Sequence, residues 1–158
     1  MKKTKEITLR KMKRKLWLLG IFKIPIIGFI KPELLFLNNE ESRVRIKLRR
    51  RTKNHLNSMY FGGLTVGADI AAGLHVFYFS EVLGYKISFA FKGFNADFIK
   101  RAETDVIFKI DQGELIHKAI TTSYETKGRV NQIVDVVAID LNEDVVANFK
   151  LVVSVKVK

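Results

Sequence analysis

Alternating apolar and polar positions predict a β-sheet. In 43–50, Val44, Ile46 and Leu48 face one side and basic residues face the other, as in a half-buried strand. The same period of two predicts further strands at 87–92, 94–98, 105–111, 129–141 and 145–158. Gly93 separates the patterns at 87–92 and 94–98, which indicates a bulge. A turn is expected at 142–144.

One apolar stretch is too long and too uniform for a strand. Residues 60–79 predict a buried helix in which Gly63, Gly67 and Ala71 recur every four residues. Each glycine costs a helix roughly 1 kcal/mol relative to alanine. We therefore expect a central helix whose smooth stripe lets a neighbouring backbone come close.

Two other stretches have the spacing of amphipathic helices. The helix expected at 5–19 carries its lysines and arginines opposite an apolar face. That apolar face consists of Ile7, Leu9, Met12, Leu16 and Leu19. A surface helix is expected at 113–126, ending near Gly128.

The segment 16–37 is apolar, but its pattern does not favour a membrane-spanning helix. Lys23, Pro25, Lys31 and Pro32 interrupt it, and no small-residue cleavage site follows. The two prolines predict extended or turning backbone. We expect a soluble, cytoplasmic protein, with peripheral membrane contact by this segment as the alternative.

The order of these elements predicts an α+β fold. Strands that occur in runs favour an antiparallel sheet, and this sheet must bury one long helix. At 158 residues, the chain is expected to form a single domain, 1–158, with the basic helix and apolar segment of 1–37 packed on it.

Positive charge is concentrated in the first third of the chain. Residues 1–53 hold 17 Lys/Arg and 4 Asp/Glu, a net of +13, whereas 54–158 hold 11 and 12, a net of −1. This asymmetry indicates an anionic partner or simply a solvated basic face. The absence of cysteine excludes disulfides and thiolate chemistry, and three scattered histidines give no metal-ligand spacing, so no metal is expected.

Asp69 is the only formal charge between His55 and Glu81. A carboxylate rarely lies in such an apolar run without a partner or a function. Its two interpretations are a catalytic group and a structural carboxylate that holds a loop or an interface through hydrogen bonds.

The element order, together with RTKNHLNSMYFGGLTVGAD at 51–69 and FNADFIKRA at 94–102, resembles the hotdog fold. The chain is similar to acyl-CoA thioesterases of the phenylacetyl-CoA thioesterase type, and more closely to an uncharacterised branch of that superfamily, a domain of unknown function. The resemblance implies an antiparallel sheet wrapped around a long central helix, with an extra N-terminal helix here. It also implies a homodimer, or a tetramer, that pairs sheets edge to edge.

In the family an asparagine precedes a His-Gly step that opens the central helix, and an acidic residue follows within that helix. Asn54 and Asp69 match the asparagine and the acidic residue. Tyr60 replaces the histidine, Phe61 replaces the first glycine, and Gly62 keeps the second.

The resemblance implies thioester hydrolysis at the start of this helix. Asp69 would act as general base or as nucleophile, and Asn54 would orient the water or the carbonyl. Backbone N–H groups of Phe61 and Gly62 would hold the oxyanion. Tyr60 would form a pocket wall or donate a hydrogen bond from its hydroxyl to the ligand, and Gly63 completes the group of expected substrate-binding residues.

A basic cluster, Arg49, Arg50, Arg51 and Lys53, directly precedes this site. It would hold the phosphates of coenzyme A, which enters as part of the substrate rather than as a cofactor, or would attract acyl carrier protein. Its alternative is a solvated strand end.

Two alternatives to an enzyme remain. The first is a non-catalytic module that binds acyl-CoA, acyl carrier protein or lipid in the same pocket. The second is binding of nucleic acid or of a membrane surface through 1–53. No nucleic-acid partner is expected, because no helix-turn-helix, RNA-recognition or zinc signature occurs.

Overall fold

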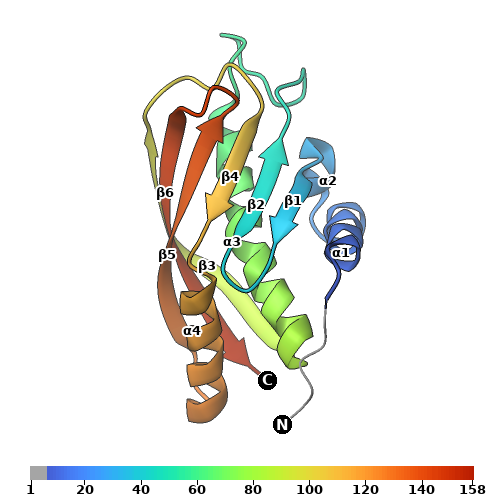
Figure 1. The fold of residues 1–158 in the computed structure, drawn as a ribbon, viewed down its shortest axis with the longest axis vertical. Coiled ribbons are helices and arrows are strands. Elements are labelled where there is room, and N and C mark those ends of the chain that lie inside the picture. The colour runs from blue at the N-terminus through green and yellow to red at the C-terminus, as the bar shows by residue number, and fades with distance from the viewer. Residues whose placement is uncertain (1–6) are drawn as a thin grey trace.

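A computed structural model describes residues 7–158. Four helices and six strands follow one another along the chain (Figure 1). They are α1 (Leu9–Phe22), α2 (Pro25–Ile30), β1 (Glu33–Leu37), β2 (Ser42–Ile46), α3 (Phe61–Leu83), β3 (Ile87–Phe98), β4 (Val106–Ile110), α4 (Gly113–Thr126), β5 (Val130–Asp140) and β6 (Val145–Val157).

The six strands form one antiparallel sheet in the order β1-β2-β4-β5-β6-β3. The long helix α3 runs along one face of this sheet, while α1 and α2 lie beyond its β1 edge (Figure 1). Helix α4 packs on β5 and β6. This arrangement confirms the predicted α+β class and the hotdog fold, with its additional N-terminal helix.

Helix α3 is the centre of the hydrophobic core. It begins after Tyr60 and ends where Gly84 takes a left-handed conformation, φ 67°. By length and composition it could cross a membrane, but 56% of its apolar window is buried inside the protein. It is therefore the core helix that the apolar run at 60–79 predicts.

The glycine stripe of α3 does face the sheet, as expected, but it meets a side chain rather than a backbone. A Cβ atom on Gly67 would lie 2.3 Å from the ring of Phe108 on β4, which is fully buried. Ala71 is also fully buried. Gly67 is therefore required because the Phe108 ring occupies the space that a side chain would need.

The N-terminal third differs most from the sequence prediction. Residues 5 and 6 of the expected helix lie outside the described part of the chain, and α1 starts at Leu9 because the Thr8 hydroxyl caps it, accepting from the backbone N–H of Lys11. Pro25 opens the short helix α2 instead of extending the chain, since proline lacks only an N–H that the first turn leaves unpaired. Strand β1, after Pro32, was not predicted.

Helices α1 and α2 touch through their backbones. A Cβ on Gly20 would lie 2.8 Å from the backbone nitrogen of Gly28, and one on Gly28 would lie 2.5 Å from the carbonyl oxygen of Gly20. The inward side chains of this helical pair, Met12, Leu16, Ile27 and Ile30, belong to the buried core. The pair is therefore a fixed part of the fold.

Strand β2 is shorter than the predicted 43–50 and ends at Ile46. Beyond it the chain leaves the sheet, because the carboxylate of Asp105 accepts from the Leu48 N–H at 2.9 Å and the Thr52 hydroxyl donates to the Lys47 carbonyl at 2.7 Å. At the opposite edge, β3 shifts register between Phe91 and Gly93, which confirms the predicted bulge.

Candidate functional site

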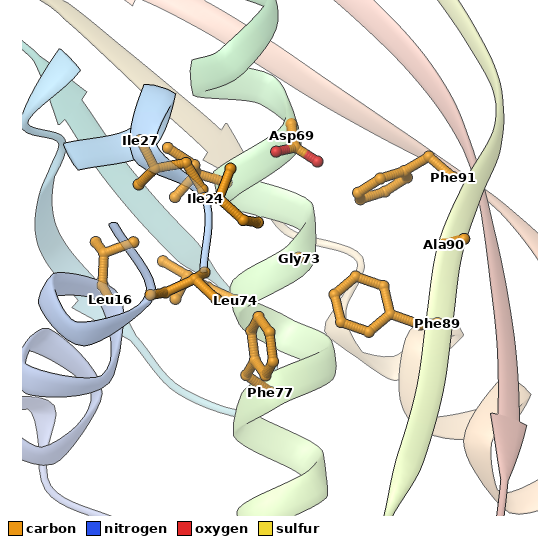
Figure 2. A pocket seen from close by; sticks show the side chains of 12 residues that line it. Leu16, Ile24, Ile27, Asp69, Gly73, Leu74, Phe77, Phe89, Ala90 and Phe91 are labelled. Atoms are coloured by element: carbon orange, nitrogen blue, oxygen red, sulfur yellow. The ribbon is translucent and has the colours of Figure 1, made fainter. Parts of the chain in front are cut away.

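Asp69 projects from α3 into a cavity of about 340 Å³ between the N-terminal helical pair and β3 (Figure 2). Its carboxylate lies between Ile24 and Ile27 on one side and Phe91 on the other (Figure 2). The remaining lining residues are Leu16, Leu19, Ile70, Gly73, Leu74, Phe77, Phe89 and Ala90. We call this space the Asp69 cavity. Asp69 is its only polar side chain, and its volume falls within the range of small-molecule pockets.

The Asp69 carboxylate has no hydrogen-bond or ion-pair partner within residues 7–158. Burial raises its pKa from 3.8 to about 6, because removal from water disfavours the charged form. A structural carboxylate would be expected to hold a loop or a contact through hydrogen bonds. Within the described chain, the Asp69 carboxylate therefore makes none of the hydrogen bonds that the structural interpretation expects.

The first turn of α3 presents free backbone donors. Tyr60 is the N-cap residue, and its carbonyl accepts from the N–H of Gly63 at 2.8 Å. The N–H groups of Phe61 and Gly62 have no acceptor within the described chain. The Tyr60 ring lies over Gly62, where a Cβ would be 2.6 Å from it. The donors expected to hold an oxyanion are thus unpaired.

A second cavity of about 490 Å³ opens at this end of α3, and we call it the entry cavity. Phe61 and Tyr60 form part of its wall, together with Phe98 at the end of β3. Asn54 also lines it. Within the described chain, therefore, Asn54 and Asp69 line different cavities, although they match one motif.

The Asn54 amide is occupied in its own loop. Its Oδ1 accepts from the backbone N–H groups of Leu56 at 2.9 Å and Ser58 at 3.2 Å, and its Nδ2 donates to the Ser58 hydroxyl at 3.0 Å. These bonds fix the loop that leads into α3. A role of Asn54 toward water or substrate stays a prediction.

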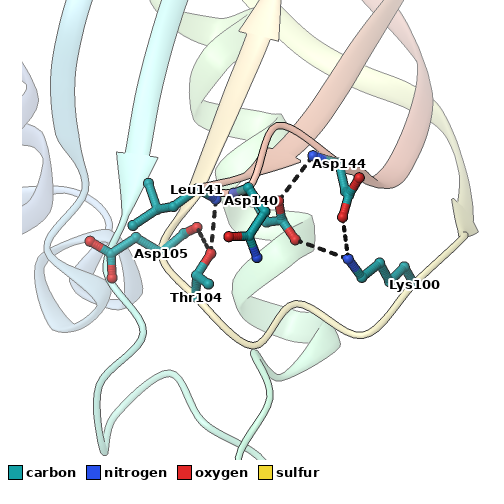
Figure 3. Close-up of polar contacts among 7 residues, drawn as sticks. Lys100, Thr104, Asp105, Asp140, Leu141 and Asp144 are labelled. Atoms are coloured by element: carbon teal, nitrogen blue, oxygen red, sulfur yellow. Dashed lines mark hydrogen bonds and ion pairs between the residues drawn. The ribbon is translucent and has the colours of Figure 1, made fainter.

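The opposite wall of the entry cavity, residues 99–102, is tied to the turn between β5 and β6 (Figure 3). Lys100 bonds the carboxylates of Asp140 and Asp144. The Thr104 hydroxyl accepts from the N–H of Leu141 at 3.0 Å.

Asp140 anchors this turn. Burial alone would raise its pKa, but the backbone N–H groups of Asp144 and Asn142 and the Lys100 ammonium outweigh it and hold the pKa below its usual value. The wall is thus held by a charged and hydrogen-bonded network.

The basic cluster forms an exposed turn after β2. Arg49 and Arg51 line a small cavity of about 210 Å³ together with Lys31 and Lys47. Arg51 donates to the carbonyl of Phe29 at 2.9 Å and stacks on its ring. Arg50 and Lys53 are exposed and do not line it.

The histidines and acidic residues give no second centre. His75 is fully buried, with its Nε2 3.2 Å from the carbonyl oxygen of Asn38, and burial lowers its pKa to about 4. Within residues 7–158, no group of three His, Asp or Glu could hold a metal ion.

Sequence reasoning identified Asp69 but not most of the cavity around it. Four lining residues come from the N-terminal helical pair: Leu16, Leu19, Ile24 and Ile27. The sequence placed Leu16 and Leu19 on the apolar face of a helix, and Ile24 and Ile27 only in the apolar segment 16–37. The alternation around Phe89 and Phe91 predicted a strand at 87–92 but did not indicate that these two rings line a cavity.

Residues 13–157 match the family described as "Domain of unknown function (DUF4442)". No curated protein matches the chain. The fold is shared with several solved structures. A Pseudomonas aeruginosa protein of unknown function, described as a probable thioesterase, is 18% identical, with 98% of this chain and 99% of that chain covered and a TM-score of 0.79.

Two further structures extend this comparison. A protein of unknown function from Chlorobaculum tepidum is 13% identical, with 94% and 96% of the two chains covered and a TM-score of 0.82. A thioesterase from Haemophilus influenzae is 13% identical, with 98% and 94% covered and a TM-score of 0.64. At these identities the likeness establishes the fold.

Proposed function

The chain belongs to the DUF4442 family, and from this premise we propose that it hydrolyses acyl thioesters, with acyl-CoA as the substrate class. The observation that carries the proposal is Asp69, an unpartnered carboxylate in an otherwise apolar cavity. Thioesterases among the solved structures of the same fold support the same reaction class.

In the proposed reaction, Asp69 acts as general base. Its carboxylate takes a proton from water as the water oxygen bonds to the thioester carbon. The carbonyl oxygen becomes an oxyanion held by the N–H groups of Phe61 and Gly62. The C–S bond then breaks, and the leaving thiolate recovers the proton from Asp69.

The spacing along α3 supports this assignment. Gly62 and Asp69 are seven residues apart, so they share one helix face about 10 Å apart along the axis. A thioester carbonyl bound by the Gly62 N–H and a water bound by the Asp69 carboxylate would together span a similar distance. Each hydrogen bond contributes about 2.9 Å, and the water oxygen lies about 3–3.5 Å from the thioester carbon. The thioester would then have to span the entry cavity, where Phe61 lies, and the Asp69 cavity, whose apolar walls would exclude bulk water.

The second candidate is a module that binds acyl-CoA, acyl carrier protein or lipid without catalysis. The replacement of the family histidine by Tyr60 favours it. Incubation with acyl-CoAs of increasing chain length separates the two candidates. We expect release of free thiol for at least one chain length and its loss in Asp69→Ala. Tight binding of an acyl-CoA without thiol release would establish the non-catalytic module instead.

We propose that the basic cluster holds the phosphates of coenzyme A. The side chains of Arg49 and Arg50 form no hydrogen bond or ion pair in the described chain, so they are free to bind an anion. Arg49→Glu with Arg50→Glu should raise KM for acyl-CoA about tenfold. KM for a thioester of a short uncharged thiol should change far less.

The matched control for this experiment is Lys118→Glu with Lys156→Glu, two exposed lysines on α4 and β6. It changes the net charge equally and should leave both KM values unchanged. Equal effects of the Arg49 and Arg50 reversals on both thioesters would instead assign the cluster to folding or solubility.

We also propose that the protein is a homodimer. Strand β3 has 12 residues and lies at the edge of the sheet, and none of its residues is fully buried. A long apolar edge strand is prone to pair with another chain. We expect light scattering at micromolar concentration to give twice the mass of the chain. A monomer under these conditions would contradict the proposal.

A further inference from the structure

The N-terminal helical pair has a second apolar face that points away from the protein. Its inward positions are already filled by core residues such as Leu16 and Ile27. Yet Trp17 is 62% exposed and Phe22 is 72% exposed. The exposed apolar set, which we call the outer patch, consists of Trp17, Ile21, Phe22, Ile26 and Phe29. Such a concentration of large exposed apolar side chains marks an interaction surface.

Basic residues accompany the outer patch. Arg10, Lys13 and Arg14 are exposed and share the outward face of α1 with two patch residues, since positions three and four apart lie on one helix face. Lys23 and Lys31 follow at the two ends of α2. None of these five cations forms an ion pair within residues 7–158.

The other two basic residues of α1 have a different task. Lys11 and Lys15 both pair with Glu81 near the end of α3 and attach the helix to the core. Residues 7–32 contain no acidic side chain at all. The outward surface of the pair is therefore both apolar and uniformly positive.

A groove beside the outer patch adds a space of suitable size. It measures about 680 Å³ and lies between the helical pair and β1. Lys13, Trp17 and Lys31 are among its lining residues, and so is Glu33, whose carboxylate is already paired with Arg45 and Lys47. A polar anionic group could be held there by ammonium groups while its apolar part contacts the indole ring.

We propose that the outer patch and its cations dock on the surface of an anionic phospholipid bilayer. Aromatic side chains with surrounding Lys and Arg are the composition of protein surfaces that lie in the headgroup region. The cations would contact lipid phosphates and carboxylates, and the apolar side chains would enter the boundary of the acyl chains.

Two other occupants fit less well. A second copy related by twofold symmetry would bring the same unpaired cations against one another, which is unfavourable. A nucleic acid would match the cations but would leave Ile21, Ile26 and Phe29 without an apolar environment. The bilayer surface satisfies both features at once.

Docking would also orient the candidate site. The inward side chains of the same helical pair line the Asp69 cavity, so the cavity would lie one helix thickness from the lipid surface. The docking proposal itself does not depend on the chemistry of Asp69, because it is tested by binding alone.

The chain contains a single tryptophan, Trp17, so its fluorescence reports on the patch directly. The full chain is titrated with vesicles of phosphatidylcholine and phosphatidylserine in equal amounts, and with vesicles of phosphatidylcholine alone. With the anionic vesicles we expect a blue shift of the emission and sedimentation of the protein with the vesicles. Both effects should be much weaker with phosphatidylcholine alone and should diminish as salt is added.

Paired variants locate the surface. Ile21→Ser with Phe22→Ser, and separately Lys13→Glu with Lys23→Glu, should each weaken vesicle binding at least about tenfold. Their controls are Ile133→Ser with Leu141→Ser and Lys118→Glu with Lys156→Glu, which remove exposed apolar or basic groups elsewhere. Circular dichroism verifies that each variant is folded.

Four results would overturn the proposal. The first is no binding to anionic vesicles, and the second is equal loss of binding in the variants and their controls. The third is a change of molecular mass by light scattering in Ile21→Ser with Phe22→Ser, which would assign the patch to contact between copies. Retention on a polyanion that is insensitive to the apolar variants would likewise favour nucleic acid.

Discussion

Asp69→Asn is expected to abolish thiol release, lowering kcat by a factor of about 10² to 10⁴, while the protein stays folded and still binds acyl-CoA. The amide keeps the shape of the carboxylate but cannot accept the proton of water. Thiol release is measured at saturating acyl-CoA, and binding is measured separately by calorimetry. The matched control is Asp111→Asn, an exposed carboxylate at the start of α4 that should leave the rate unchanged.

The same variant should be more stable than the parent protein at neutral pH. The pKa of Asp69 is raised by burial from 3.8 to about 6, so the ionised form costs the folded state up to about 3 kcal/mol. The stabilising effect of the raised pKa is fully present below about 3.8 and is lost as pH rises through about 6. The excess stability of Asp69→Asn should therefore grow over that interval, and chemical denaturation at several pH values measures it.

The activity of the parent protein should rise with pH, whereas its stability falls over the same interval. Because the base must be ionised, kcat/KM should rise as pH increases through about 6 and then level off. A folded Asp69→Asn protein that hydrolyses acyl-CoA at the parent rate would exclude Asp69 as the base. Loss of stability in this variant, with activity lost only through unfolding, would restore the structural interpretation.

Gly67→Leu is expected to have the largest effect on stability. The new side chain would collide with the ring of Phe108, which is fully buried. Overpacking of a core costs about 1–3 kcal/mol or more, a large part of the stability of a small domain. The loss is measured as a lower Tm and a lower free energy of unfolding.

A second glycine of the same helix supplies the control. A Cβ on Gly73 would lie 3.7 Å from the Phe89 ring, an ordinary contact. Gly73→Ala should therefore stabilise the helix by up to about 1 kcal/mol, whereas Gly67→Ala should destabilise the protein. If the two alanine variants behave alike, or if Gly67→Leu leaves Tm unchanged, α3 is not packed on the sheet as described.

The sequence predicted the sheet and α3 well because burial in the strands follows a period of two and α3 is a long, uniformly apolar run. The alternation in β2 places Val44 and Ile46 in the core, and residues 61–79 of the predicted run lie within α3. The N-terminal third was harder to predict, because Pro25 fits either a break or the first turn of a helix. Strand β1 forms by antiparallel pairing with β2. A pattern within residues 33–37 alone cannot predict this pairing.

The candidate site was predictable only in part, for a similar reason. Asp69 stands out because a charge in an apolar run is costly, whatever the fold. The separation of Asn54 from Asp69 into two cavities depends on how the loop before α3 folds, through hydrogen bonds made by the Asn54 amide itself. The walls contributed by α1 and α2 depend on tertiary contacts between distant segments.

The backbone contact between Gly20 and Gly28 fixes the two helices of the N-terminal pair against each other. It brings Leu16, Leu19, Ile24 and Ile27 to the Asp69 cavity as one unit, without any residue of the sheet. Changes in the size of these four side chains would therefore reshape one wall of the Asp69 cavity, while the helix that carries Asp69 keeps its own sequence. Under the proposed function, acyl-chain preference and the chemical step would thus be encoded in separate parts of the chain.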